Sequence, residues 1–137
     1  MKHVMTILIA GLLSLGSFSQ AKIEFETKTI DYGTIEKGSD GVRVFKFKNT
    51  GDEPLIISKV SSSCGCTIPK KPKDPILPGE SGEIEVKYDT KRVNPIRKTV
   101  TVISNAKDNP TVALKIKGIV LNHDRYKKMK EKEEKKK

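Results

Sequence analysis

The 137-residue sequence is poor in the side chains on which most enzymes rely. It has two histidines, His3 and His123, and two cysteines, Cys64 and Cys66. It contains no Gly-x-Ser-x-Gly motif, no glycine-rich phosphate-binding loop and no pair of acids in a recognisable catalytic setting. We therefore predict that the protein is not an enzyme, with no catalytic residues and no cofactor.

Long apolar runs are also missing, except at the N-terminus. There, Lys2 is followed by mostly apolar residues from Val4 to Phe18 and by a small-residue exit that ends at Ala21. This pattern is typical of a secretory signal peptide, and the run is shorter than the roughly 20 residues that a spanning helix needs. We expect residues 1–21 to be a signal peptide rather than a retained anchor. Its removal would leave no transmembrane segment, in an exported compartment where disulfides are permitted.

Acidic residues are outnumbered by basic ones, most densely at the C-terminus. Residues 22–121 carry 18 basic and 13 acidic groups, whereas residues 122–137 carry 8 and 4. In an intracellular protein such a Lys-rich tail would indicate nucleic-acid binding, because lysines release counterions from phosphate backbones. Export argues against a nucleic-acid partner. The tail is therefore expected to serve solubility or to make weak contact with an anionic envelope surface.

Residues 22–121 lack helical periodicity and alternate as β-strands do. Turn residues separate seven segments rich in β-branched and aromatic residues, at 23–27, 43–48, 55–60, around Thr67, 82–89, 99–103 and 112–117. Their spacing predicts an all-β domain of two packed antiparallel sheets over residues 22–121.

Two further stretches do not fit the strand pattern. Four prolines, at 69, 72, 75 and 78, interrupt regular pairing because proline lacks an amide donor, and they predict an ordered loop. Residues 122–137 are Lys- and Glu-rich without a continuous apolar stripe, which predicts a tail that is helical and frayed, or disordered.

Two phrases flank the cysteine segment SCGCT at 63–67. The first comprises DYGTIEKG at 31–38, FKFKNTG at 45–51 and PLII at 54–57, and the second is LPGESGEIEV at 77–86. Together they resemble the exported bacterial family known as domain of unknown function 1573, over roughly residues 25–118. The resemblance implies an immunoglobulin-like sandwich of about seven strands, related to major-sperm-protein, Hydin and PapD-type domains. It also implies the periplasm or envelope of a Gram-negative bacterium, or secretion from one, and no established activity.

The signature residues of these phrases are interpreted as structural. They are Tyr32, Gly33, Gly38, Asn49, Gly51, Pro54, Pro78 and Gly79. Gly33 and Gly38 would supply the positive φ needed where the chain crosses between sheets. The Asn49 side chain would cap the turn that follows it.

The Cys64-Gly65-Cys66 segment could carry redox chemistry. In an extended strand the two Cα atoms would lie about 6.6 Å apart, near the upper limit for a disulfide. Gly65 would let the backbone contract, and a bond would then close a very small, strained ring suited to thiol–disulfide exchange. Exchange also needs a lowered thiol pKa. The candidate cations, Lys59, Lys70 and Lys71, are neighbours only in sequence.

Metal binding and simple docking remain as alternatives for the same segment. Two thiolates could hold Cu(I), or Zn²⁺ with two further ligands, but the remaining candidates, His123 and Met129, lie in the tail. We assign no metal site. The main prediction is a non-catalytic module that binds an envelope protein or peptide by strand addition or loop contacts. Lysines at 46, 48, 115 and 117 would favour acidic partners if their strands are edges, and otherwise form a solvated face.

Overall fold

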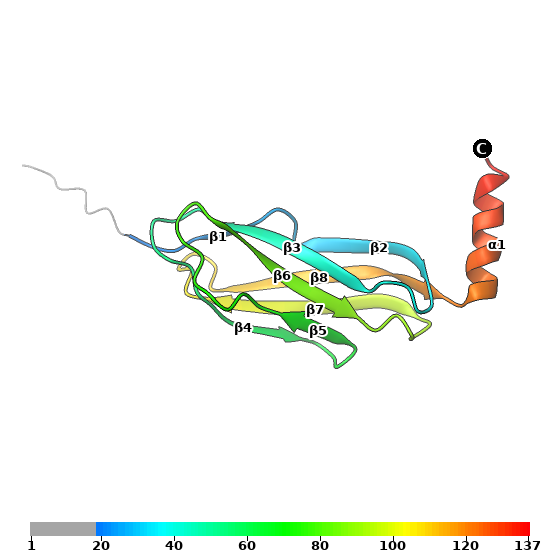
Figure 1. Ribbon diagram of the computed structural model, residues 1–137, viewed down its shortest axis with the longest axis horizontal. Coiled ribbons are helices and arrows are strands. Elements are labelled where there is room, and N and C mark those ends of the chain that lie inside the picture. Colours follow the sequence, from blue (N-terminus) through cyan, green and yellow to red (C-terminus); the bar gives the residue numbers. More distant parts are fainter. Residues whose placement is uncertain (1–18) are drawn as a thin grey trace, which may run out of the picture.

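The computed structural model describes residues 19–137, which form eight strands and one helix. The elements are β1 (Ile23–Phe25), β2 (Thr29–Glu36), β3 (Val42–Asn49), β4 (Ile57–Ser62), β5 (Thr67–Lys70), β6 (Ser81–Tyr88), β7 (Pro95–Ser104), β8 (Thr111–Leu121) and α1 (His123–Glu134). One sheet has the order β1-β3-β6-β5 and the other β2-β8-β7-β4, and the two stack face to face (Figure 1). The predicted β-sandwich is confirmed. Residues 1–18 of the predicted signal peptide lie outside the described residues.

The core lies between the two sheets and is filled by alternate residues of the long strands. Phe45 and Phe47 of β3 are almost completely buried, and the Phe47 ring lies 5.4 Å from that of Phe25. On β8, Leu114 and Ile116 are buried in the same way. The lysines between these positions point outward on interior strands, so they form a solvated face and not an edge.

Strand β2 is the element that the sequence pattern does not predict. It lies at the edge of its sheet, parallel to β8, and its register shifts between Asp31 and Thr34. Gly33 has a φ of 65°, and a Cβ on Gly118 of β8 would lie 2.8 Å from the Gly33 carbonyl oxygen. The extra residue forms a β-bulge. Gly33 therefore serves a bulge inside a strand, whereas the prediction had placed it at a crossing between sheets.

The proline-rich stretch is partly a strand and partly a loop. Pro69 lies within β5 and pairs with Val86 of β6, which corrects the expectation that pairing stops there. A proline fits in β5 because this strand is outermost in its sheet, where one row of amides has no partner strand. After β5 the chain has no regular strand until β6, apart from a bridge between Leu55 and Ile76.

The residues just before β1 are part of the folded domain. Ala21 is buried in the core, and the Gln20 amide donates to the Asp52 carboxylate at 2.7 Å. This hydrogen bond holds the pKa of Asp52 below its ordinary value. Cleavage after Ala21 would remove these contacts from the mature protein.

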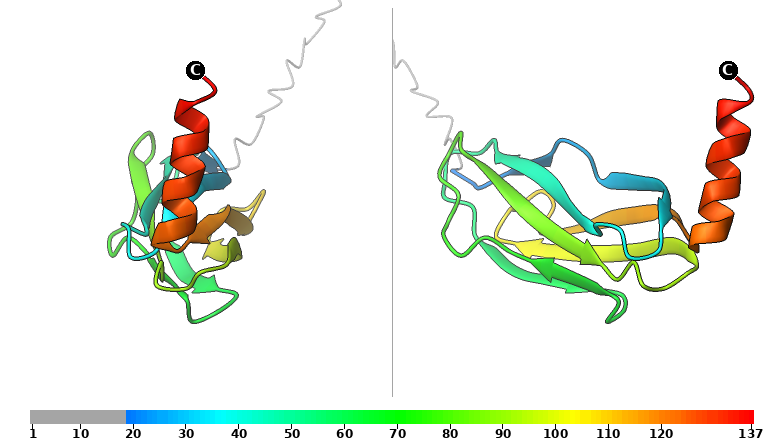
Figure 2. Two further views of the ribbon diagram at one scale, coloured as in Figure 1. Left: turned by 90° about the vertical axis from the view of Figure 1, so that its right-hand side faces the viewer. Right: turned by 45° about the vertical axis from the view of Figure 1, so that its right-hand side comes forward.

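Helix α1 stands across one end of the sandwich (Figures 1 and 2). The Asn122 side chain caps it by accepting the Arg125 amide at 3.1 Å, and His123 Nδ1 lies 2.5 Å from Glu36 Oε1 of β2. No residue of this helix is buried. Of the two predicted states of the tail, the structure has the helix. Among the described residues, no helix is both long and apolar enough to cross a membrane.

Candidate functional site

The Cys64-Gly65-Cys66 segment connects β4 to β5, which are the outermost strands of the two sheets. The two cysteines form a disulfide, and their Cα atoms lie 5.4 Å apart. This is less than the roughly 6.6 Å that two residues span in an extended strand, so the chain contracts at Gly65. A Cβ on Gly65 would meet no atom within 4 Å. The outer side of the disulfide loop is therefore open.

Backbone hydrogen bonds tie this loop to both sheets. The Ser63 amide donates to the Thr99 carbonyl of β7 at 3.0 Å, and the Thr99 amide donates to Ser63 Oγ at 3.3 Å. From the other sheet, the Asp89 amide donates to the Cys66 carbonyl at 2.8 Å. The loop is consequently a fixed part of the end of the sandwich that also carries the β2–β3 connection, the β6–β7 connection and α1 (Figure 1).

The two sulfur atoms have different surroundings. Cys66 is buried in the core, and its Sγ lies 3.9 Å from the Thr67 hydroxyl oxygen. Cys64 is only partly buried, and its Sγ accepts the Cys66 amide at 3.3 Å. Cys64 is therefore the sulfur that another molecule can approach.

The cations expected near the disulfide are not brought to it by any described contact. Of Lys59, Lys70 and Lys71, the last points its Nζ at the Ile57 carbonyl, 3.4 Å away. A different lysine follows from the β4–β7 pairing: beyond the Ser62–Val100 pair and the Ser63–Thr99 hydrogen bonds, the next residue of β7 toward the disulfide loop is Lys98. Sequence reasoning could not find Lys98, because 34 positions separate it from Cys64.

A metal at this site gains no support from the donors around it. Within residues 19–137, no three His, Cys, Asp or Glu side chains are grouped as metal ligands would be. His123 is paired with Glu36, and both sulfurs are in the disulfide.

Most of the large exposed apolar side chains belong to one segment of the chain. Ile56, Ile68 and Leu77 are 49%, 65% and 50% exposed, and all three belong to residues 55–77, which include β4, the disulfide loop and β5. We call this segment the β4–β5 edge. The remaining large exposed apolar residue, Val93, lies in the β6–β7 connection.

Among the signature residues, Tyr32, Gly33 and Gly38 lie toward the end of the sandwich that carries the disulfide. The Tyr32 hydroxyl donates to the Gly41 carbonyl at 2.7 Å, and the Arg43 guanidinium lies 4.3 Å from the centre of the Tyr32 ring. Gly38 has a φ of 83° in the turn where the chain crosses from β2 to β3. None of these residues has a described contact with either cysteine.

Tyr32 makes stability depend on alkaline pH. Burial raises the pKa of Tyr32 to about 12 from an ordinary value of 10.0. Above pH 10 the unfolded chain loses this proton while the folded chain keeps it, so stability falls as the pH rises toward 12, by up to about 2.7 kcal/mol. Burial also raises the pKa of Tyr88, which adds to the slope. Urea unfolding at pH 8 and pH 11 should show this loss, and Tyr32→Phe should reduce it. If the free energy of unfolding falls equally with pH in the wild type and in Tyr32→Phe, the assignment to Tyr32 is wrong.

The other signature residues gather at the opposite end, around Asn49. The fully buried Asn49 side chain accepts the Gly51 and Lys22 amides at 3.0 and 3.3 Å and donates to the Glu53 and Ile76 carbonyls at 2.7 and 2.9 Å. Nearby, the Pro54 carbonyl accepts the Asn105 side chain at 3.0 Å, and the Gly79 amide, after Pro78, donates to the Asn49 carbonyl at 2.8 Å. These contacts support the structural interpretation.

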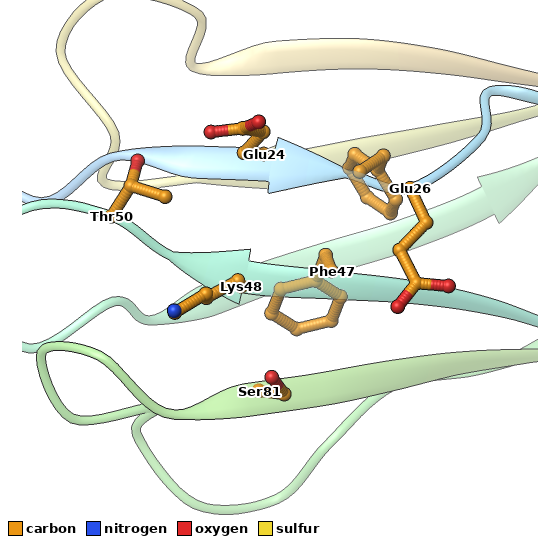
Figure 3. Close-up of a pocket in the computed structure, with 7 residues that line it drawn as sticks. Glu24, Glu26, Phe47, Lys48, Thr50 and Ser81 are labelled. Carbon is orange, nitrogen blue, oxygen red and sulfur yellow. The ribbon is translucent and has the colours of Figure 1, made fainter.

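The outer surface of the β1-β3-β6-β5 sheet has a shallow hollow bordered by charges of both signs. The hollow of about 330 Å³ is bordered by Glu24, Glu26, Lys48, Thr50 and Ser81, with Phe47 beneath (Figure 3). Glu24 and Lys48 are directly opposite each other on β1 and β3. Opposite charges in such a position stabilise a sheet, so this surface requires no ligand to explain it.

Comparison with known proteins gives the same fold. An uncharacterised protein of Porphyromonas gingivalis matches with a TM-score of 0.66 at 18% identity, over 80% of this chain and 51% of its own. A PapD-like domain of human CEP192 matches with a TM-score of 0.62 at 11% identity, over 86% and 99% of the two chains. The VesB protease of Vibrio cholerae matches with a TM-score of 0.57 at 14% identity, over 73% of this chain and 32% of its own.

These likenesses show the fold alone, and the chain spans about half the length of the Porphyromonas protein. No curated protein sequence matches the chain significantly. The model of the family described as protein of unknown function DUF1573 matches residues 23–120, which include all eight strands except the last residue of β8. The chain belongs to the DUF1573 family.

Proposed function

We propose that this protein is an exported, non-catalytic interaction module of the cell envelope that binds a protein partner along the β4–β5 edge. The observation that carries the proposal is the exposure of Ile68, an isoleucine 65% accessible on an outermost strand, two residues beyond the disulfide. With Ile56 and Leu77 it gives this edge most of the large apolar side chains that the described surface exposes. An exposed apolar side chain on an outermost strand can anchor a partner that adds to the sheet.

The backbone of the same edge suits an extended partner. Strand β4 pairs with β7 on one side only, so it presents unpaired amide and carbonyl groups on the other. A peptide can add to such a strand through backbone hydrogen bonds and gain specificity from side-chain contacts. Strand β5 is a poorer site for strand addition because Pro69 lacks a backbone amide donor. We therefore assign backbone pairing to β4 and apolar anchoring to Ile68.

Replacing Ile68 with lysine tests this assignment. Ile68→Lys should abolish capture of the partner from envelope extract, because the substitution puts a charge where an apolar contact forms. The matched control is Val93→Lys, which makes the same change at an exposed position outside the edge. Both variants should unfold at nearly the wild-type denaturant concentration. Equal capture by wild type and Ile68→Lys would contradict the proposal, and a chain ending at Leu121 would show whether the helix recruits the partner.

The proposal includes a domain organisation and a location. Residues 1–21 are a signal peptide, residues 22–121 the binding domain and residues 122–137 an appended Lys/Glu-rich segment, in the periplasm or envelope of a Gram-negative bacterium or secreted from it. Support comes from the N-terminal pattern of Lys2, the apolar run and Ala21. N-terminal sequencing of the protein recovered from the envelope fraction tests both the cleavage and its position.

A second candidate function, thiol–disulfide exchange at Cys64 and Cys66, is favoured by one observation. The disulfide closes a ring of only three residues. By chain entropy, so short a loop contributes only about 1.6 kcal/mol to stability, far less than a long one. The bond therefore stabilises the fold only weakly, and the accessible Cys64 sulfur makes thiol–disulfide exchange an alternative role.

The exchange step follows from the two sulfur environments. A partner's thiolate attacks Cys64 Sγ and breaks the bond to Cys66, whose sulfur leaves as a thiolate, beside the Thr67 hydroxyl 3.9 Å away, and takes up a proton. The partner's second thiolate then attacks its own sulfur in the mixed disulfide and releases Cys64. Two electrons pass from the partner, which becomes a disulfide, to the cysteine pair, which becomes a dithiol.

The two single serine variants separate this function from a structural disulfide. Cys66→Ser leaves the reachable thiol free and should accumulate a mixed disulfide with a partner, visible as a shifted band that reductant removes. Cys64→Ser leaves only the buried sulfur and should trap little. Equal trapping by both variants, or wild-type cysteines that stay free and unreactive in oxidising buffer, would exclude the exchange.

A further inference from the structure

The two outer sheet surfaces of the sandwich carry charge in opposite ways. On the β1-β3-β6-β5 sheet, acids and bases face each other across the strands, as Lys46 faces Glu83 and Lys70 faces Glu85. On the β2-β8-β7-β4 sheet, Lys117 has Asp31 of β2 on one side but Arg97 of β7 directly opposite it on the other. Like charges placed opposite each other destabilise a sheet. A need for solubility does not explain two like charges placed opposite each other, because the other sheet keeps its outer surface polar with pairs of opposite charge.

The like-charged pair lies in a hollow with another cation and no acid. A depression of about 430 Å³ is bordered by the cationic side chains of Arg97, Lys115 and Lys117 and by the hydroxyl-bearing Thr29 and Thr99. The nearest acid is Asp31 on β2, whose carboxylate is 3.8 Å from Lys117 Nζ. One weak, exposed ion pair leaves the depression strongly positive. Its chemistry suits an anionic group.

The positive surface continues along β8 to the C-terminal helix. Beyond Lys117 the next side chains of β8 that line the surface are Ile119 and Leu121, and α1 follows immediately. A second depression, also of about 430 Å³, is bordered by Ile119, Leu121, Arg125, Lys128, Met129 and Lys132. Arg125, Lys128, Met129 and Lys132 are spaced as one face of a helix. We call Arg97, Lys115, Lys117, Arg125, Lys128 and Lys132 the cationic strip.

We propose that the cationic strip docks this protein on an anionic lipid bilayer surface. Six cations accompanied by Ile119, Leu121 and Met129 combine charge with a small apolar step. Basic and apolar side chains on one surface are the combination that binds anionic headgroups and enters the headgroup–acyl boundary. An acidic protein surface would pair with the cations but would leave the apolar side chains of Ile119, Leu121 and Met129 without a contact.

The bilayer surface is distinct from the edge that binds the proposed protein partner. The strip lies on β7, β8 and α1, whereas Ile68 belongs to β5 in the other sheet and β4 offers its unpaired backbone on the side away from β7. Both surfaces can therefore be occupied together. A protein docked through the strip would hold its β4–β5 edge and disulfide loop close to the membrane without inserting a helix. Failure of either proposal leaves the other standing.

Vesicle binding tests the proposal. The protein is purified from its own cells, and mass spectrometry establishes its N-terminus. The wild type should bind vesicles of phosphatidylglycerol in phosphatidylcholine, should bind phosphatidylcholine alone weakly, and should dissociate at high salt. Arg97→Gln/Lys115→Gln/Lys117→Gln should weaken binding by about a hundredfold, as should Arg125→Gln/Lys128→Gln/Lys132→Gln. The matched control, Lys46→Gln/Lys48→Gln/Lys87→Gln, removes the same charge from the other sheet and should bind like the wild type.

A single apolar substitution decides between lipid and an acidic polymer. Met129 is not buried, so Met129→Gln should leave the fold intact. It should weaken vesicle binding several-fold and leave binding to poly-glutamate unchanged. Unchanged vesicle binding by this variant would replace the lipid surface with an acidic polymer as the partner. An equal loss of vesicle binding in the control variant, or no preference for phosphatidylglycerol, would show that the cationic strip is not the binding surface.

Discussion

Replacing Asn49 with alanine should lower the free energy of unfolding by about 4 kcal/mol. The side chain makes four hydrogen bonds from a fully buried position, and two of them satisfy the carbonyls of Glu53 and Ile76. The bond to Ile76 is buried and the other three are partly buried, so losing each costs on the order of 1 kcal/mol. Both amides that Asn49 accepts lose their partner too, and nothing in alanine compensates.

Asn105→Ala is the control that isolates burial. Asn105 also accepts an amide, that of Ile56 at 2.8 Å, and donates to the Pro54 carbonyl at 3.0 Å, but it is exposed. Water can replace those bonds, so the loss should stay near 1 kcal/mol or below. Urea unfolding of both variants measures the difference. Losses of similar size would mean that Asn49 is an ordinary turn residue and not the buried connection between three segments.

The sequence predicts best those parts of the fold whose burial follows a local rule. Strands β3, β6 and β8 alternate buried and exposed residues along most of their length, and a period of two can be read directly. Strand β2 escapes this reading because Tyr32 is its single buried residue and the bulge at Gly33 breaks the alternation. Its pairing with β8 links residues more than eighty positions apart. No local pattern specifies such a contact.

The candidate site shows the same limit. The sequence places Cys64 and Cys66 in one connection, and the contraction at Gly65 is a local property of the chain. The position of Lys98 next to the disulfide loop, by contrast, depends on the register of β4 against β7. The like-charged pair of Arg97 and Lys117 depends on the register of β7 against β8. Both the difference between the two sulfurs and the positive sheet surface arise from topology, which one sequence does not encode as a visible pattern.

Gly41→Ala should destabilise the end of the sandwich that carries the disulfide, by about 3 kcal/mol. A Cβ on Gly41 would lie 2.1 Å from the Tyr88 carbonyl oxygen, which is backbone and cannot rotate away. The Gly41 carbonyl also accepts the Tyr88 amide at 3.0 Å and the Tyr32 hydroxyl at 2.7 Å. The substitution therefore forces the end of β6 away from Gly41.

That displacement should reach the disulfide, because the residue after Tyr88 holds the loop. The Asp89 amide donates to the Cys66 carbonyl, so moving β6 should expose the buried sulfur and speed reduction of the bond by dithiothreitol under native conditions. Gly65→Ala is the matched substitution: its Cβ would meet nothing within 4 Å, and its φ is not positive. It should stabilise the protein by about 0.5 kcal/mol through the unfolded chain. If Gly41→Ala lowers stability without changing the rate of reduction, the disulfide loop is not held by β6 and opens on its own.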